Sequence, residues 1–464
     1  MRYISTRGAA PAAGFIDCLL AGLAPDGGLY LPEAWPAVPP EEIAGFSNRP
    51  YAQVAAAILE RFADGEIAEA TIASLCAEAH AGFDHAAVTP LRQIAPGRFL
   101  LELFHGPTLA FKDLAMQLLA PLCDHALAAR GRTATIVCAT SGDTGGAAAE
   151  AFRGRANIRL VALFPEGRIS AVQRRFMTTA REDNVRAVAV AGDFDDCQAI
   201  LKALFADRAF AGEVGLAAVN SINFARILAQ SVYWFVAASA LGAPVRPLSF
   251  AVPTGNFGDA FSGWAAAAMG LPIEAIIVAT NANDIVARAL TAGRYARRPA
   301  LATRSPAMDI QVASNFERLY FEAAGRDAAA TAAAFERFAA SGAIDIPGPV
   351  LAAMRGLLTG VSASEVDTRR AMADAFRLTG DLVDPHTAVA LAGLDAARAA
   401  LSGAPVVVLA TAHPAKFPDA VLAATGQSPP TPSRVRDLAD RPERIDRLAA
   451  DVEAVKAYVR AFAA

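Results

Sequence analysis

One lysine lies in a sequence that suits covalent chemistry. The stretch Phe104-His105-Gly106-Pro107-Thr108-Leu109-Ala110-Phe111-Lys112-Asp113 brings Lys112 directly after three apolar residues. A lysine that acts as a nucleophile must be neutral, and apolar surroundings disfavour its ammonium form. A surface lysine at the start of a helix, paired with Asp113, is the alternative interpretation. Lys112 alone does not decide between the two.

Two glycine-bearing turns each follow an apolar run and could bind anions. The turn Thr254-Gly255-Asn256-Phe257-Gly258 offers backbone N–H groups at the start of a predicted helix, where the helix dipole favours negative charge. The turn Ser141-Gly142-Asp143-Thr144-Gly145 adds three short polar side chains, which could bind a carboxylate. An ordinary strand-to-helix turn explains either one alone. Together they suit an enzyme of amino-acid chemistry with one site for a cofactor phosphate and one for a substrate carboxylate.

A third polar cluster precedes a predicted helix. The run Asn220-Ser221-Ile222-Asn223-Phe224-Ala225-Arg226 brings a guanidinium about one helical turn after two amides and a hydroxyl. Such a set could bind a phosphate or a carboxylate, because the planar guanidinium matches the geometry of both. A capped helix with a solvated Arg226 is the alternative.

The composition argues against several other kinds of chemistry. The six histidines show no metal-ligand spacing with carboxylates or cysteines, so no metal site is predicted. The five cysteines form no CxxC pair and are odd in number, which indicates a reducing cytoplasm. The 42 basic and 46 acidic side chains nearly cancel, and no basic run predicts a nucleic-acid partner.

The elements that must position these residues have the pattern of an α/β protein. Apolar runs pass through the two glycine-bearing turns into alanine-rich helical patterns at 133–152 and 248–269, as βα units do. A third predicted strand, at 405–410, ends at Thr411. In open α/β sheets, ligands bind beyond the carboxyl ends of such strands. We therefore expect the polar residues at these three ends to share one site.

The flanking segments are predicted to be mainly helical. Residues before 90 form a separate helical and loop-like cap, and a charged terminal helix follows the proline-rich linker around 429–432. The uncharged segment from Ile227 to Val245 contains Gln230 and Pro244, so it predicts a buried helix rather than a membrane span. The amino terminus lacks the continuous apolar core of a signal peptide.

These segments together resemble the threonine synthase family. The resemblance recurs from Tyr3 to Asp419, and the His-Gly-Pro-Thr run before Phe-Lys-Asp is its most specific part. Further matching segments are Tyr3 to Gly8, Asp26 to Pro32, Ser141 to Gly145, Asn220 to Arg226, Pro253 to Asp259, Asp384 to Thr387 and Thr411 to Phe417. The resemblance implies the fold of tryptophan-synthase β-like enzymes that depend on pyridoxal phosphate.

In that fold two open, mostly parallel sheets flank a cofactor cleft, and the helical cap precedes them. We expect the cap at 1–90, the lysine segment with a smaller mobile α/β domain at 91–245, and a larger α/β domain with C-terminal helices at 246–464. The implied reaction converts O-phosphohomoserine and water into L-threonine and phosphate, by γ-elimination of phosphate followed by β-addition of water.

The resemblance also implies a role for each motif. Lys112 would hold pyridoxal 5'-phosphate as a Schiff base and move protons among the substrate carbons. Thr411 would meet the pyridine nitrogen through its hydroxyl group. The cofactor phosphate would bind to Gly255, Asn256, Phe257 and Gly258. The substrate carboxylate would bind to Thr140, Ser141, Asp143 and Thr144, and the substrate phosphate to Asn220, Ser221 and Arg226.

Some questions stay open at this level. The resemblance gives no individual roles to Asp384, His386, His413 and Lys416, and the contact of Asp143 is undetermined. A dehydratase or β-replacement synthase of the same fold, or a silent relative that binds a phosphorylated ligand without turnover, is the alternative. The expected partner is the small-molecule substrate, with neither nucleic acid nor membrane, and the expected state is a cytoplasmic monomer or homodimer.

Overall fold

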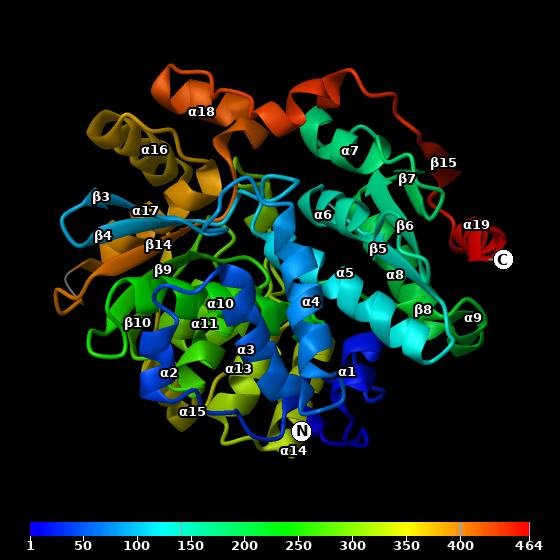
Figure 1. The fold of residues 1–464 in the computed structure, drawn as a ribbon, viewed down its shortest axis with the longest axis horizontal. Coiled ribbons are helices and arrows are strands. Elements are labelled where there is room, and N and C mark those ends of the chain that lie inside the picture. The colour runs from blue at the N-terminus through cyan, green and yellow to red at the C-terminus, as the bar shows by residue number, and fades with distance from the viewer. Residues whose placement is uncertain (141, 399–400, 464) are drawn as a thin grey trace.

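The chain folds around two separate sheets. The computed structural model describes residues 1–140, 142–398 and 401–463. Figure 1 shows one sheet on each side of the molecule, with the N-terminal helices packed below and in front of them. The lysine-bearing helix α5 (Lys112–Ala129) runs beside the five-stranded sheet.

The larger sheet has six strands in the order β13-β10-β9-β14-β4-β3. Neighbouring strands are parallel, except for the antiparallel β3–β4 pair at one edge. The strands are β3 (Leu91–Ala95), β4 (Arg98–Glu102), β9 (Leu248–Pro253), β10 (Ile273–Thr280), β13 (Leu358–Ser362) and β14 (Val406–Ala410). All residues of β9 and β14 are buried, as expected for parallel strands covered on both faces.

The smaller sheet has five parallel strands in the order β15-β7-β6-β5-β8. The strands are β5 (Ala134–Ala139), β6 (Ile158–Pro165), β7 (Val185–Ala191), β8 (Leu216–Ala217) and β15 (Asp446–Ala449). Its helices are α6 (Asp143–Phe152), α7 (Ala171–Thr178), α8 (Phe194–Ala206), α9 (Arg208–Glu213) and α19 (Val452–Ala463). The chain thus returns to this sheet after it has completed the larger one.

The N-terminal cap is mainly helical, as predicted. It contains α1 (Phe15–Ala21), α2 (Pro40–Gly45), α3 (Tyr51–Ala63) and α4 (Glu69–Ala81), with a small antiparallel pair of β1 (Tyr3–Ser5) and β2 (Tyr30–Pro32). Its buried aromatic residues belong to the same hydrophobic core as α10 (Phe224–Ala240), so the cap packs on the body of the protein.

Further helices cover the larger sheet and connect its strands. They are α11 (Gly258–Ala268), α12 (Ile285–Ala292), α13 (Phe316–Ala323), α14 (Ala328–Ser341), α15 (Gly348–Arg355), α16 (Glu365–Thr379), α17 (Pro385–Ala397) and α18 (Pro418–Thr425). Three 3₁₀ helices, η1 (Pro306–Met308), η3 (Pro414–Lys416) and η4 (Ser433–Ala439), and the pair β11 (Arg294–Ala296) and β12 (Ala343–Asp345) complete the described elements.

The predicted fold class is confirmed, while the predicted domain boundaries stay a prediction. Strands β3 and β4 fall in the predicted range 91–245 but pair with the larger sheet, and β15 falls in 246–464 but pairs with the smaller one. The uncharged segment after Ile227 lies in the buried helix α10, as predicted. No helix in the described part of the chain combines the length and apolar composition needed to cross a membrane.

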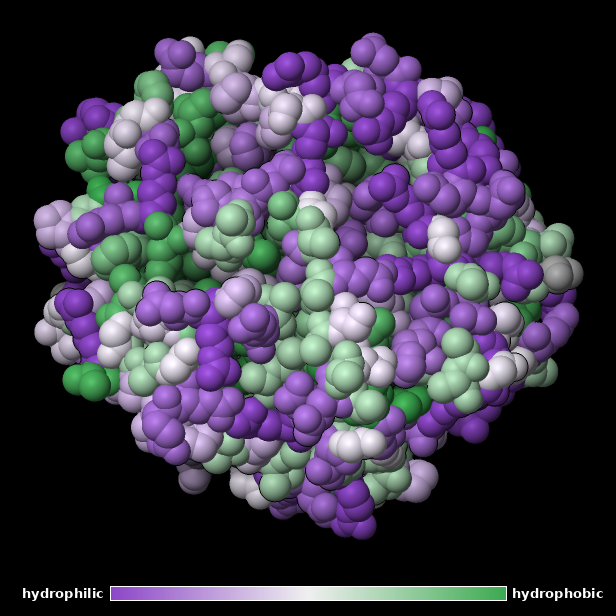
Figure 2. Space-filling model, in the orientation of Figure 1, coloured by the Kyte–Doolittle hydropathy of each residue, from purple (hydrophilic) through white to green (hydrophobic). Residues whose placement is uncertain are grey.

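The surface carries a mixture of side chains. Figure 2 shows hydrophilic residues over most of the visible face, with the most hydrophobic ones gathered at the left, in the region of α16, β3 and β4. The exposed large hydrophobic side chains of the chain are scattered, and Val245 and Leu378 are the most exposed of them. Single exposed apolar residues are normal on a protein surface.

Candidate active site

The loop before Lys112 is fixed to the end of strand β14. The Phe111 N–H donates to the Thr411 carbonyl at 2.8 Å, and Ala110 forms a bridge with Ala412. Helix α5 begins at Lys112, whose side chain is 14% exposed. The predicted lysine therefore lies between the two sheets, beside the end of the third predicted strand.

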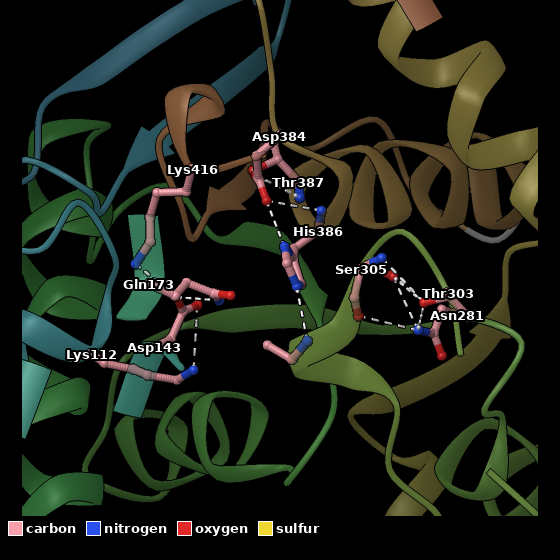
Figure 3. A network of polar contacts seen from close by, with 11 residues as sticks. Lys112, Asp143, Gln173, Asn281, Thr303, Ser305, Asp384, His386, Thr387 and Lys416 are labelled. Carbon is pink, nitrogen blue, oxygen red and sulfur yellow. Dashed lines mark hydrogen bonds and ion pairs between the residues drawn. The ribbon is translucent and has the colours of Figure 1, made fainter. Parts of the chain in front are cut away.

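A buried carboxylate from the smaller sheet faces this lysine. Asp143, the first residue of α6, places Oδ2 3.6 Å from the Lys112 Nζ atom. Its Oδ1 accepts hydrogen bonds from Lys416 Nζ at 2.7 Å and from Gln173 Nε2 at 3.0 Å. Figure 3 shows Lys112 and Lys416 approaching Asp143 from different elements. One carboxylate thus lies between two ammonium groups.

Burial and charge oppose each other in this cluster. Burial lowers the pKa of Lys112, Asp143 raises it, and the positive charges of Lys416 and Arg226 lower it again, so that the net direction is downward. Burial alone would raise the pKa of Asp143, but the charges of Lys416 and Lys112 outweigh burial and hold it well below its usual range. The site combines an ionised carboxylate with a lysine that loses its proton more readily than one in water.

The turn between β5 and α6 is organised by Thr140. Its Oγ1 accepts hydrogen bonds from the N–H groups of Gly142 and Gly145, each at 2.9 Å. Gly142 has a φ of 131°, which a residue with a Cβ rarely adopts. Thr144 is half-buried, and Ser141 lies outside the described residues. The predicted substrate-carboxylate role of this turn stays a prediction.

The predicted phosphate cradle, the turn between β9 and α11, packs closely against the segment around Ala307. A Cβ on Gly255 would lie 2.8 Å from the Ala307 carbonyl oxygen, so only glycine fits there. Phe257 adopts a left-handed conformation with φ of 64°, and its ring is buried against Phe316. Phe257 therefore offers its backbone to the site, while its side chain belongs to the core.

The cluster at 220–226 brings a buried guanidinium to the site. Arg226 is 3% exposed, and its Nε atom has no hydrogen-bond partner among the described residues. Burial lowers the pKa of Arg226 to about 10. The Asn220 Oδ1 atom is also buried and unpaired in the described part of the chain. A buried cation normally has a carboxylate partner, and Arg226 forms no ion pair within the described residues.

The cradle and this cluster are joined by residues that the sequence did not single out. Ser221 and Ser314 share a hydrogen bond of 3.0 Å, and Ser314 donates to the Asn256 Oδ1 atom at 3.3 Å. Asn315 donates its side-chain amide to the Ser221 carbonyl at 3.0 Å. Ser314, Asn315 and Gln173 lacked a motif, because each lies in an ordinary polar stretch that only the fold brings to the site.

The segment Asp384-Pro385-His386-Thr387 supports the cradle from behind. His386 Nδ1 lies 2.7 Å from Asp384 Oδ2, and His386 Nε2 accepts the Ala307 N–H at 3.2 Å. The Nδ1 atom therefore carries the proton and donates a hydrogen bond to the Asp384 carboxylate. Figure 3 shows His386 between Asp384 and the loop before α13. Because Ala307 covers Gly255, this pair fixes the backbone behind the cradle.

The chain matches known proteins over nearly its whole length. Three family models match: "Threonine synthase N terminus" at 2–80, "Pyridoxal-phosphate dependent enzyme" at 83–358 and "Threonine synthase, C-terminal" at 387–459. The chain is 48% identical to a threonine synthase of Pseudomonas aeruginosa over 460 residues, covering 99% of this chain and 98% of the relative.

Two solved structures extend the comparison to the fold. A threonine synthase from Brucella melitensis with bound pyridoxal phosphate matches with a TM-score of 0.97 and 51% identity, covering 100% of this chain and 99% of that one. The yeast threonine synthase matches with a TM-score of 0.93 and 35% identity, covering 99% and 98%. A human protein named "Threonine synthase-like 2" is 34% identical over 96% of this chain and 93% of its own length.

Proposed function

The chain belongs to the threonine synthase family of pyridoxal-phosphate-dependent enzymes, and we propose that it converts O-phosphohomoserine and water into L-threonine and inorganic phosphate. The reaction eliminates phosphate from the γ carbon and adds water at the β carbon. The observation that carries the proposal is the buried Arg226, which has no carboxylate within ion-pair distance in the described chain.

The residues present fit pyridoxal phosphate. Glycine at 255 lets the turn pack directly against the Ala307 carbonyl, and the backbone N–H groups at the start of α11 suit the cofactor phosphate. Thr411 offers a neutral hydroxyl at the end of β14, on the strand next to the cradle. When bound, the cofactor supplies an aldehyde that a lysine can carry and a ring that takes up carbanion charge. Lys112 is the lysine at this place.

The proton transfers fall to Lys112. Its lowered pKa favours the neutral amine, which can accept a proton from a substrate carbon and return it at the next carbon. The nearby Asp143 carboxylate stabilises the ammonium form that arises between these two steps. The Asp143 turn, with Thr140, Ser141 and Thr144, is proposed to bind the substrate carboxylate.

The substrate phosphate is proposed to bind Arg226, Ser221 and Asn220. A dianionic phosphate would supply the negative charge that the Arg226 side chain lacks, and it would accept from the Ser221 hydroxyl. Dehydratases of the same fold act on substrates without phosphate, so this contact separates the two activities. The hydrogen bonds through Ser314 connect this subsite to Asn256 and so to the cofactor cradle.

Replacement of Arg226 by alanine tests the proposal. We expect kcat/KM for O-phosphohomoserine to fall by about 30-fold or more, because a buried charge-assisted contact contributes about 2–5 kcal/mol. Release of phosphate and formation of threonine are measured together, and the cofactor affinity is measured by titration of the visible absorbance. The affinity for pyridoxal phosphate should change by less than about threefold.

Four outcomes would overturn the proposal in part or as a whole. Equal losses of substrate use and cofactor binding in Arg226→Ala would place Arg226 in the cofactor site. Phosphate release without threonine in the wild-type protein would reduce the activity to elimination. A wild-type protein that takes up no pyridoxal phosphate, or binds it without turnover as a silent relative would, would end the proposal altogether.

We propose that the protein is cytoplasmic. All five cysteines are buried and unbridged, which suits a reducing cytoplasm. A monomer or homodimer is proposed, and light scattering of the purified protein distinguishes these two states.

A further inference from the structure

Lys416 occupies a place that the proposed reaction leaves without a role. Of the 42 basic side chains only four are lysines, and two of these, Lys112 and Lys416, share one buried carboxylate. Lys416 is 1% exposed and ends the 3₁₀ helix η3, which follows β14 of the larger sheet. A buried ammonium group is costly, so its contacts must compensate for the lost hydration.

The contacts of Lys416 join the two halves of the protein. Its Nζ atom lies 2.7 Å from Asp143 Oδ1 and donates to the Thr108 carbonyl at 2.9 Å. Asp143 begins α6 and Phe176, whose ring centre is 5.3 Å from this Nζ atom, lies on α7, both on the smaller sheet. Lys416 thus connects an element of the larger sheet with the lysine loop and with the smaller sheet (Figure 3).

The two oxygen atoms of Asp143 have different tasks. Oδ1 is occupied by Lys416 and Gln173, and these fixed contacts hold the carboxylate in one orientation. Oδ2 is left to face Lys112 at 3.6 Å, which is within ion-pair distance but longer than a hydrogen bond. The amine of Lys112 therefore experiences the charge of Asp143 and stays free to approach a substrate carbon.

We infer that Lys416 is a positioning residue, which holds the Asp143 carboxylate against Lys112 and shares its charge, and thereby sets the proton affinity of the Lys112 nitrogen. The inference rests on the proposed function, in which Lys112 moves protons during turnover. The other titratable groups that face the two lysines are Arg226, near Lys112, and Asp113 and His413, near Lys416. None of these three forms an ion pair with Asp143 within the described residues.

If Lys416 and Lys112 share the charge of Asp143, removal of Lys416 and removal of the Asp143 charge should shift the pKa of the Lys112 nitrogen in opposite directions. Without Lys416, Asp143 acts on Lys112 alone and favours its protonated form, so the pKa of the Lys112 nitrogen should rise. Without the Asp143 charge, the protonated form loses its counterion, so that pKa should fall. A residue that only fills space would produce neither change.

The test follows the visible absorbance of the bound cofactor as the pH is varied. In Lys416→Met we expect the midpoint of the absorbance change to rise by about one pH unit relative to the wild type. In Asp143→Asn it should fall. Lys456→Met, at a lysine that pairs with Asp207 and Glu453 far from the site, is the control and should keep the wild-type midpoint.

A double variant tests whether Lys416 acts through Asp143. In the Asp143→Asn background, the Lys416→Met change should shift the midpoint much less than it does in the wild type. Gln173→Met removes a hydrogen bond to the same Oδ1 atom without removing a charge, so its shift should be smaller than that of Lys416→Met. Lys416→Arg keeps the charge and should stay near the wild-type midpoint.

A second readout needs no cofactor. The pH dependence of Lys112 acetylation in the apoprotein, followed by mass spectrometry, should show the same upward shift in Lys416→Met. If Lys416→Met keeps the wild-type midpoint in both measurements, or shifts it equally with and without Asp143, the inference is wrong. A wild-type protein without the visible band would instead contradict the proposed function, and so the two failures are distinguishable.

Discussion

Asp143 and Asp259 occupy similar places in the two strand-to-helix turns, yet their surroundings move their pKa values in opposite directions. Each directly follows a glycine in the first turn of a buried helix, α6 or α11. The charges of Lys416 and Lys112 overcome burial at Asp143 and lower its pKa. The Asp259 carboxylate accepts one hydrogen bond within the described residues, from the Tyr233 hydroxyl, and burial raises its pKa to about 7.

The two turns thus differ in the groups that they present at the start of a helix. The β5–α6 turn brings side-chain charge, because an ionised carboxylate positions two ammonium groups there. The β9–α11 turn brings backbone N–H groups, and its carboxylate is turned away from the cradle toward Tyr233. An ionised Asp259 would repel the phosphate that this turn is proposed to bind, and a neutral Asp259 would not.

The largest expected effect concerns the stability of the Asp259 region. Because the folded pKa of Asp259 lies above the unfolded value near 4, the folded state binds the extra proton between about pH 4 and pH 7. Its contribution to stability is complete below pH 4 and decreases by up to about 4 kcal/mol as the pH rises to 7. Denaturant unfolding of the wild type and of Asp259→Asn at several pH values measures how the free energy of unfolding depends on pH in each protein. The same pH dependence in both proteins would contradict the prediction.

The next effect is expected at the cradle itself. Gly255→Ala places a Cβ against the Ala307 carbonyl, so we expect the affinity for pyridoxal phosphate to fall by about 30-fold, or about 2 kcal/mol. Gly348→Ala is the matched control, because a Cβ there meets no atom within 4 Å. Cofactor titration of the two variants measures the effect. Equal affinities would show that the turn does not need the close approach.

The smallest effect is expected for His386, which reaches the cradle through Ala307. His386→Leu removes the acceptor of the Ala307 N–H, which should cost about 1 kcal/mol and weaken cofactor binding about fivefold. His386→Gln offers a replacement oxygen acceptor and should recover part of the loss. If both variants bind the cofactor as the wild type does, His386 supports α17 rather than the cradle.

Part of the fold was predictable because several of its strands are short, mostly apolar runs. β5, β9 and β14 lie in continuous apolar runs with turn signals at their ends, and these mark parallel strands directly. β15 could not be found in this way, because the four residues Asp446–Ala449 include two charged ones and follow a proline-rich linker. Only pairing with β7 makes them a strand.

Candidate site residues could be chosen from the sequence only where one short motif holds the groups that the chemistry needs. The structure brings the lysine and the β5–α6 turn together, since Lys112 Nζ and Asp143 Oδ2 lie 3.6 Å apart. The partner of Asp143 was not predictable, because Lys416 is distant in the sequence and only the packing of the two halves brings its ammonium group to that carboxylate. The burial of the Phe257 ring was not predictable either, because its neighbour Phe316 is also distant in the sequence.

The late return of the chain to the smaller sheet has a consequence for synthesis on the ribosome. Until residues 446–463 have been made, β7 has a neighbour on only one side, and its other edge offers unpaired backbone groups to any passing strand. The sheet of the smaller half therefore cannot be completed before the larger half has been translated. Newly made chains should depend on chaperones that shield this edge during that interval.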